Sequence, residues 1–285
     1  MSNKSNNYGR AYEYAWIIGL ESAISASRSI EIVNNSSLDA NKKAWDEIPE
    51  EIHYELVKSV DAALDTVLEL EPKLTEPSNK PIKLQFQSDD AGKKGDVRDV
   101  VARRQEINWE VGLSIKHNHK AVKHSRLSST IDFGSLWYGV PCSNEYWDAV
   151  SPTFDMLKNE KAKKTKWKEF LTKEDDVYLP ILSAFMAEVN RAYSADSTMP
   201  KKMVEYLIGV KDYYKIVSYK RRNLTLIHSF NLHNTLNKPS SIRASAISVP
   251  LVMLPDELVA IRFKSNSKTT VEMYLNNGWQ LSFHS

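Results

Sequence analysis

The chain has 285 residues, and its 38 Lys and Arg against 36 Asp and Glu give a net charge of +2. A hydrophobic content of 42% is sufficient for a packed core, and the balanced charge excludes a largely disordered chain. No apolar run is long enough to cross a bilayer and the N-terminus is polar, so we expect a cytoplasmic protein without a signal peptide or a membrane partner. Because Cys142 is the single cysteine, an internal disulfide and a cysteine-rich zinc site are also excluded.

The first 70 residues predict two helices. One spans residues 8–30, where apolar side chains recur at helical spacing. The other spans residues 46–70, with Asp46 as its cap and Pro49 in its first turn. Its apolar stripe consists of Ile52, Leu56, Val60, Ala63 and Val67. The segment that follows, residues 71–81, holds three prolines and predicts a loop.

From residue 82 onward the pattern changes to strands. Segments 82–87, 96–103 and 109–116 are rich in β-branched and aromatic residues, which favour strands. Residues 105–108 are suited to a turn between the last two segments. The sequence therefore predicts a short meander of three strands in the middle of the chain.

The second half of the chain returns to helices and then to strands. Helical patterns cover residues 143–210, where first turns are expected at Pro152, Pro180 and Pro200. The strands that follow are predicted over 213–220, 223–230 and 257–264, with a hairpin over 271–283 that turns at Asn277-Gly278. This order predicts an α/β fold, on the border of α+β, in which helices flank a mixed sheet.

One hairpin of the predicted sheet brings acidic residues to a lysine. Since side chains alternate along a strand, Ser114 and Lys116 share one face. If the turn centres at 106–107, Asp99 lies opposite Ser114 and diagonal to Lys116. A shift of one residue puts Asp96 opposite Lys116 instead, and both registers remain open. Such a pair is suited to metal-assisted phosphodiester hydrolysis, and its alternative is a cross-strand salt bridge worth under about 1 kcal/mol.

Several blocks of the sequence resemble a known nuclease family. GDVRDVV followed by EVGLSIKHNH is similar to the D…(D/E)-x-K core of the PD-(D/E)XK nuclease superfamily. More narrowly, NNYGRAYEYA, GDVRDVVARR, WEVGLSIKHNHKAVKHSRLSSTIDFG and YWDAVSPTF resemble the HaeIII-type type II restriction endonucleases, which cut GGCC. The resemblance implies a PD-(D/E)XK core, Mg²⁺ as the cofactor with no small-molecule cofactor, and hydrolysis of double-stranded DNA by a homodimer.

The resemblance also implies roles for individual residues. Asp96 or Asp99 would bind the metal, and Lys116 would be the lysine of the motif. The sequence departs from the pattern at Ser114, where the superfamily usually has an acid, because serine cannot supply a negative ligand. A second acidic ligand must therefore come from another part of the chain.

An N-terminal helix is the expected source of the missing acid. Glu110 cannot replace it, because the six residue steps of strand from Glu110 to Lys116 span about 20 Å. In the superfamily such a helix often provides a glutamate, and Glu13 in GRAYEYA is therefore the first choice. Glu21 and Glu55 are the alternatives.

Basic residues gather in clusters that suit a polyanion. Between residues 93 and 126, nine Lys and Arg face four Asp and Glu, and further clusters lie at 157–168 and 219–223. Residues 120–126 predict a helix whose basic side could hold phosphates, while Asn118 and Arg126 could reach base edges. Arg243 competes with the other arginines as a guanine reader. The candidate DNA-binding residues are His117, Asn118, His119, Lys120, Lys123, Arg126, Arg221 and Arg222.

We expect a single endonuclease domain over residues 1–285. Its catalytic core would cover about 8–135, and a helical and C-terminal β region of about 143–285 would serve DNA recognition and dimerisation. Two alternatives remain: a non-catalytic DNA-binding module that uses the same basic clusters, and a structural zinc protein that uses His117 and His119.

Overall fold

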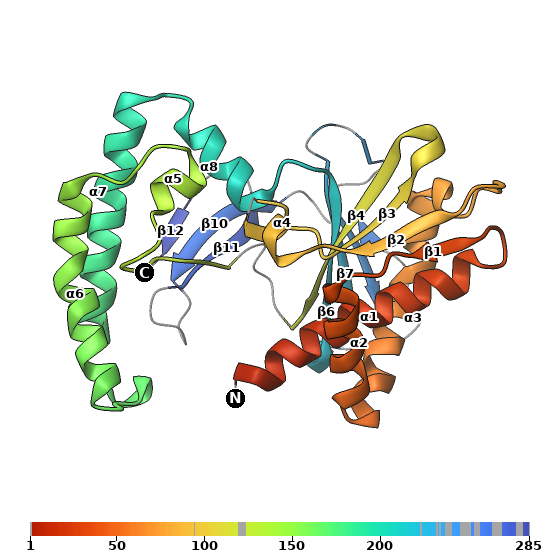
Figure 1. Cartoon of the computed structure of the whole chain (residues 1–285), viewed down its shortest axis with the longest axis horizontal. Coiled ribbons are helices and arrows are strands. Elements are labelled where there is room, and N and C mark those ends of the chain that lie inside the picture. Colours follow the sequence, from red (N-terminus) through yellow and green to blue (C-terminus); the bar gives the residue numbers. More distant parts are fainter. Residues whose placement is uncertain are drawn as a thin grey trace. The chain divides into compact units, whose positions relative to one another are not determined.

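The computed structural model describes residues 2–93, 95–118, 124–222 and 224–231, residues 233, 235 and 236, and the strand segments 241–245, 252–253, 257–263, 270–277 and 282–284 (Figure 1). Contacts divide the chain into two compact units. The first comprises Met1–Lys120 and Val210–Asp256, and the second comprises Ala121–Gly209 and Glu257–Ser285. Each unit is thus built from segments that are far apart in the sequence.

The first unit contains an eight-stranded mixed sheet with the order β1-β2-β3-β4-β6-β7-β8-β9. The pairs β1–β2 and β4–β6 are parallel, and the other pairs are antiparallel. This arrangement confirms the predicted mixed sheet and the α/β class. The strands are β1 Ile30–Ile32, β2 Ile82–Phe86, β3 Val100–Arg104, β4 Trp109–His117, β6 Tyr213–Tyr219, β7 Leu224–Phe230, β8 Ser241–Ser245 and β9 Val252–Met253.

The hairpin of β3 and β4 has the first of the two registers considered from the sequence. Val100 lies opposite Leu113, and Arg104 lies opposite Trp109. The turn is a short 3₁₀ helix, Gln105–Ile107, followed by Asn108 in the left-handed conformation with φ 50°. Asparagine tolerates this conformation better than most residues, so it closes the turn. The ladder ends at the pair of Val100 and Leu113, and the Asp99 N–H also donates to Leu113 O at 2.8 Å, so Asp99 lies at the end of the ladder.

Helices α1, Ser2–Ile24, α2, Ser36–Glu47, and α3, Glu50–Leu70, belong to the same unit (Figure 1). The prediction of one helix over 46–70 was wrong at its start, because Asp46 lies in the last turn of α2. Pro49 precedes α3 as its N-cap residue, and the extended conformation that proline imposes on Ile48 ends α2. The first helix ends at Ile24 instead of residue 30, since Ile30–Ile32 pairs with β2 as strand β1.

Helices α1–α3 cover one face of the sheet and form the core with it. Helix α1 packs against β4, α2 against β2 and α3 against β7. A chain of buried hydroxyls links α1, α3 and β7, with 2.7 Å between Tyr12 Oη and Ser59 Oγ and 2.7 Å between Ser59 Oγ and Thr225 Oγ1. Because Tyr12 precedes Glu13, this chain fixes the side of α1 on which Glu13 lies.

In its described residues, the second unit contains helices α5 to α8, two shorter helices, and a four-stranded sheet with the order β12-β10-β11-β5. Pro180 and Pro200 lie in first turns as predicted, but Pro152 lies well inside α6, so that prediction was wrong. The helices are α5 Phe133–Trp137, α6 Asn144–Ala162, α7 Leu179–Ala195 and α8 Met199–Ile208, and the strands are β5 His124–Arg126, β10 Glu257–Phe263, β11 Thr270–Asn277 and β12 Ser282–His284. Shorter helices of the chain are α4 Asp89–Lys93, Pro72–Leu74, Trp167–Glu169, Glu174–Tyr178 and Lys220–Arg222.

Two further predictions fail in this unit. The predicted hairpin over 271–283 does not form. Strand β12 pairs in parallel with β10, whereas β11 pairs with β10 and β5. Gly278 of the expected turn lies outside the described residues. The helix expected over 120–126 is absent from its described part, since β5 pairs with β11 as a strand. Among the described helices, none is long and apolar enough to cross a membrane.

Candidate active site

Asp99 and Lys116 meet where β3 begins. Asp99 Oδ2 accepts hydrogen bonds from Lys116 Nζ at 2.8 Å and from the backbone N–H of Ile115 at 2.6 Å. Ser114 Oγ also approaches the same oxygen at 3.5 Å. Strand β3 begins at Val100, one residue after Asp99. The Asp99 carboxylate therefore accepts the Ile115 N–H in place of a backbone carbonyl of β3. The hairpin therefore holds the Asp99 carboxylate against the Lys116 ammonium.

Glu13 joins this pair from helix α1. Asn41 of α2, itself buried, donates from Nδ2 to Glu13 Oε2 at 2.8 Å. Burial raises the pKa of Glu13 to about 8, and the negative charge of Asp99 adds to this effect, whereas Lys116 and Asn41 act in the opposite direction. Three titratable side chains, from α1, from β4 and from the residue before β3, thus interact in one site, and all three are among the candidates from the sequence.

The site keeps its lysine charged. Burial alone would lower the pKa of Lys116, but the negative charges of Asp99 and Glu13 raise it above the ordinary value. The Lys116 and Asp99 side chains remain 22% and 20% exposed, so the pair is reachable from solvent. The arrangement offers two carboxylates and one ammonium to a ligand.

Asp96 is held elsewhere. Its two carboxylate oxygens accept from Arg98 Nε at 2.9 Å and Arg98 Nη2 at 2.8 Å, and Gln87 Nε2 donates to one of them. Burial would raise the pKa of Asp96, but the contacts with Arg98 hold it below its ordinary value. Of the two aspartates left open by the sequence, the structure therefore brings only Asp99 to Lys116.

Arg98 makes a second ionic contact across β4. Its Nη1 donates to Glu110 Oε1 at 2.9 Å, and its side chain runs over Gly112, where an added Cβ would lie 2.0 Å from Arg98 Cδ. Sequence reasoning missed this contact. A glycine inside a strand is the feature that could have revealed it, because such a glycine often marks a close approach.

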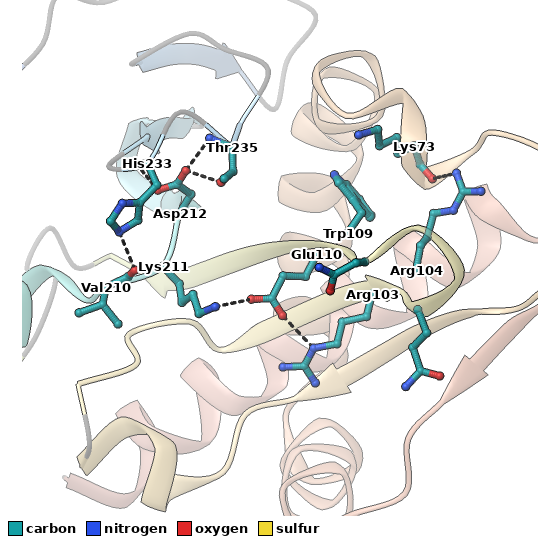
Figure 2. A pocket seen from close by; sticks show the side chains of 12 residues that line it. Lys73, Arg103, Arg104, Trp109, Glu110, Val210, Lys211, Asp212, His233 and Thr235 are labelled. Atoms are coloured by element: carbon teal, nitrogen blue, oxygen red, sulfur yellow. Dashed lines mark hydrogen bonds and ion pairs between the residues drawn. The ribbon is translucent and has the colours of Figure 1, made fainter.

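A pocket of about 810 Å³ lies at the other end of the β3–β4 hairpin (Figure 2). Figure 2 shows Arg103 and Lys211 turned toward Glu110, with 3.0 Å and 3.6 Å between their nitrogens and its oxygens. Lys73, Arg104, Gln105, Asn108, Trp109, Val210, Asp212, His233 and Thr235 complete the lining. The acidic site and this pocket are therefore different places in the unit.

His117 and Asn118 follow Lys116 but are committed to contacts within the protein. The His117 ring packs edge-on against Tyr8 and Tyr12, and burial is the main cause that lowers its pKa. Asn118 donates its backbone N–H to Ser218 O at 2.7 Å and accepts the Lys220 N–H at 2.9 Å, so it ties the end of β4 to β6. Neither residue is oriented as a free base reader.

The other candidates are spread over the chain. Glu55 pairs with Lys220 at 2.6 Å, and Glu21 is exposed on α1, so Glu13 is the glutamate that reaches the site. Arg221 is exposed in Lys220–Arg222, and the side chains of Arg126 and Arg222 are not described. His119, Lys120 and Lys123 lie outside the described residues. Within the described part of the chain, no three His, Cys, Asp or Glu residues are grouped to hold a metal, which gives the zinc alternative no support there.

Comparison with known proteins agrees with the geometry. A curated relative, the type II restriction enzyme HaeIII of Haemophilus aegyptius, is 46% identical over 284 residues, which cover 99% of this chain and 89% of that enzyme. No solved structure matches. The model of the HaeIII restriction endonuclease family matches residues 9–285. A match of this extent confirms the resemblance seen in the sequence, and the chain belongs to the HaeIII restriction endonuclease family.

Proposed function

We propose that this restriction endonuclease hydrolyses double-stranded DNA at GGCC with Mg²⁺ as its cofactor, and that Asp99, Glu13 and Lys116 carry the reaction. The contact of 2.8 Å between Lys116 Nζ and Asp99 Oδ2, with Glu13 beside it, is the observation that supports this proposal most. It joins an acid and a lysine in the order and spacing of a nuclease motif. The second acid in this proposal is Glu13 of α1, because Ser114 of β4 cannot supply a negative charge.

The residues of the site fit a hard divalent cation. Asp99 and Glu13 offer carboxylate oxygens, which Mg²⁺ prefers, and their mutual repulsion is what a cation would relieve. Mg²⁺ usually takes one or two carboxylates and fills its other positions with water and phosphate oxygens, so two acids are sufficient. When bound, the cation polarises the phosphate and lowers the pKa of a water molecule.

The side chains of this site have distinct tasks in the proposed mechanism. The Lys116 ammonium orients the attacking water or stabilises the charge that develops on the phosphate. The backbone N–H of Ile115 holds the Asp99 carboxylate, and Asn41 holds the Glu13 carboxylate, so neither acid has to reorganise when DNA arrives. Hydrolysis would leave a 5′-phosphate, as in the chemistry of the superfamily.

The proposed assembly is a homodimer. GGCC reads the same on both strands, and a two-fold dimer places one site on each strand. The division of roles into a catalytic core of about 8–135 and a recognition and dimerisation region of about 143–285 stays a prediction. Strand β6 lies beside β4 in the sheet, so residues after 210 also support the catalytic unit.

Digestion of a plasmid with and without Mg²⁺ tests this function. We expect fragments with ends that map to GGCC, only when Mg²⁺ is present, and no cleavage of GGCC-methylated plasmid. Tight, salt-sensitive DNA binding without Mg²⁺-dependent cleavage would instead indicate the non-catalytic binding module. Ends at other sequences would refute GGCC while leaving the nuclease assignment intact.

A further inference from the structure

Arg98 directly precedes Asp99, and its side chain, which is only 3% exposed, runs over Gly112 of β4. It donates from Nε and Nη2 to Asp96 and from Nη1 to Glu110. Its backbone N–H also donates to Asp96 Oδ1 at 3.1 Å. The guanidinium therefore links Arg98 to Asp96 within the segment 96–98 and links this segment to Glu110 of β4.

The geometry of Gly112 shows that this attachment needs space over the strand. A Cβ at residue 112 would lie 2.0 Å from Arg98 Cδ and 2.7 Å from Arg98 Cγ, distances at which the arginine has to move. The backbone of Gly112 pairs with Val101 within the regular ladder, so the glycine is required by the arginine rather than by a turn. Asp96, Arg98, Gly112 and Glu110 are called the Arg98 clamp below.

The Arg98 clamp directly precedes Asp99, the proposed metal ligand. Asp99 follows Arg98 directly, and its backbone is bonded on both sides, from its N–H to Leu113 O at 2.8 Å and from Gln87 N–H to its carbonyl at 2.9 Å. These hydrogen bonds fix the position of the Asp99 backbone between β2 and β4. The path of the chain into Asp99, and with it the direction of the carboxylate, depends on the segment that the clamp holds.

We propose that Arg98 is a positioning residue of the nuclease: through Asp96 and Glu110 it fixes the chain before Asp99, so that the Asp99 carboxylate points at Lys116 Nζ and the metal. The inference rests on the proposed function of Asp99. It assigns no contact between Arg98 and DNA, because the guanidinium is buried and its three nitrogens already have acidic partners.

Two substitutions disturb the clamp by different routes. Arg98→Lys keeps the charge but loses the two-pronged contact with Asp96, and Gly112→Ala keeps every charge but displaces the arginine. Loss of a group that orients a metal ligand typically costs about 10- to 100-fold in metal affinity or activity. We expect kcat to fall by a factor of this size and the Mg²⁺ concentration for half-maximal cleavage to rise, with KM for DNA unchanged.

A double variant separates positioning from general damage. In Arg98→Ala the methyl added by Gly112→Ala no longer meets Arg98 Cδ and Cγ, and only the Cβ of residue 98 remains, at 3.3 Å, so adding Gly112→Ala should cost little further activity. Glu110→Gln, which leaves Arg98 and Asp96 in place, serves where Arg98→Ala does not fold. Glu106→Gln is the matched control, because Glu106 lies in the turn of the same hairpin, away from Asp99. Its carboxylate pairs with Arg104 at 2.9 Å and with Arg28 at 3.2 Å.

The expected pattern is a loss of kcat and Mg²⁺ response in the clamp variants that Glu106→Gln does not show at equal folded fraction. Wild-type kcat and Mg²⁺ response in Arg98→Lys, Gly112→Ala and Glu110→Gln would overturn the proposal, as would additive losses in the double variant. Binding of Mn²⁺, measured by electron paramagnetic resonance, distinguishes a failure of the proposed nuclease function from a failure of the positioning role of Arg98. If the wild type does not cleave DNA, the proposed function fails, whereas unchanged Mn²⁺ affinity in the clamp variants contradicts the positioning role alone.

Discussion

Lys116 Nζ and the backbone N–H of Ile115 donate to the same oxygen of Asp99, at 2.8 Å and 2.6 Å. One carboxylate oxygen is thus held by two successive residues of β4, a cation and a backbone amide. The hairpin alone therefore brings the Asp99 carboxylate to the Lys116 ammonium.

Replacing Lys116 by alanine should remove cleavage while DNA binding remains. The ammonium lies 2.8 Å from Asp99 and also interacts electrostatically with Glu13. Removing a group that stabilises transition-state charge costs about 10²- to 10³-fold in kcat. The measurement is the single-turnover rate on a GGCC duplex. Equal rates for wild type and Lys116→Ala would refute the assignment of this lysine.

A lysine far from the site controls for the loss of charge. Lys43 is exposed on α2 and lies 3.8 Å from Glu47, so Lys43→Ala also removes one positive charge. Its cleavage rate should stay at the wild-type level, because exposed pairs of this kind contribute about 0–1 kcal/mol. Comparable losses in both variants would point to general electrostatics instead of a role for Lys116.

Glu13→Gln should abolish cleavage and at the same time stabilise the metal-free protein. Above its pKa of about 8, Glu13 carries a negative charge in a half-buried position beside Asp99, and this repulsion lowers the free energy of unfolding. The amide has no charge, and Asn41 can still donate to it. Thermal unfolding in a chelator above pH 8 should give a higher Tm for Glu13→Gln.

Added Mg²⁺ provides the contrast for this variant. A ligand that binds only the folded protein raises Tm, so Mg²⁺ should stabilise the wild type. Glu13→Gln lacks one of the two carboxylates and should respond much less. An equal response to Mg²⁺ in both proteins would mean that Glu13 is not a metal ligand.

Much of the site could be predicted because its information is local. The turn at 105–108 and the alternation of β3 and β4 set the register, which pairs Val100 with Leu113 and brings Asp99, at the end of the ladder, to Lys116. A slip of one residue would have favoured Asp96, and no feature near the turn distinguishes the two. Glu13 came only from the resemblance, since a helix 86 residues before Asp99 gives no local indication of where it packs.

The errors concern contacts between distant segments. Strand patterns located β11 and β12, but they do not encode the partner of a strand, and β12 pairs with β10. Helix α2 was missed because its sequence is polar, although Asn35 caps it by accepting the Leu38 N–H at 2.9 Å. The contact of Arg98 with Glu110 spans two strands, so neither residue's neighbours in the sequence revealed it.

Glu106 should make the fold sensitive to acid. The hydrogen bond from Arg104, followed by the contact with Arg28, lowers the pKa of Glu106 to about 2 from its ordinary value of 4.5. Because the folded state holds this carboxyl ionised, its contribution to stability is complete above pH 4.5 and is lost as the pH falls toward 2. Urea unfolding of wild type and Glu106→Gln should show a difference at pH 7 that shrinks below pH 4.5. A difference that is constant from pH 7 to pH 2.5 would contradict the ion pair.

Asn41 should matter for cleavage more than for stability. Its Nδ2 is 2.8 Å from Glu13 Oε2 and gives that carboxylate a fixed direction from α2. Asn41→Ala removes the donor without adding charge, and loss of such an orienting contact typically costs about 10- to 100-fold in metal affinity or activity. We expect this loss in kcat and a higher Mg²⁺ requirement, measured as initial cleavage rates over a Mg²⁺ series.

Asn35 offers the opposite case on the same helix. Its side chain accepts the Leu38 N–H and donates to Phe86 O at 3.0 Å, so it caps α2 and joins it to β2 without touching Glu13. Asn35→Ala should lower the free energy of unfolding by about 0.5–2 kcal/mol, the usual cost of a lost cap, and leave kcat unchanged at temperatures where the protein is folded. If Asn35→Ala and Asn41→Ala lose activity in equal measure, α2 acts only as a scaffold and the orienting contact on Glu13 has no separate effect. If Asn41→Ala alone changes the Mg²⁺ requirement, the amide acts through the Glu13 carboxylate, because that is its single side-chain contact among the described residues.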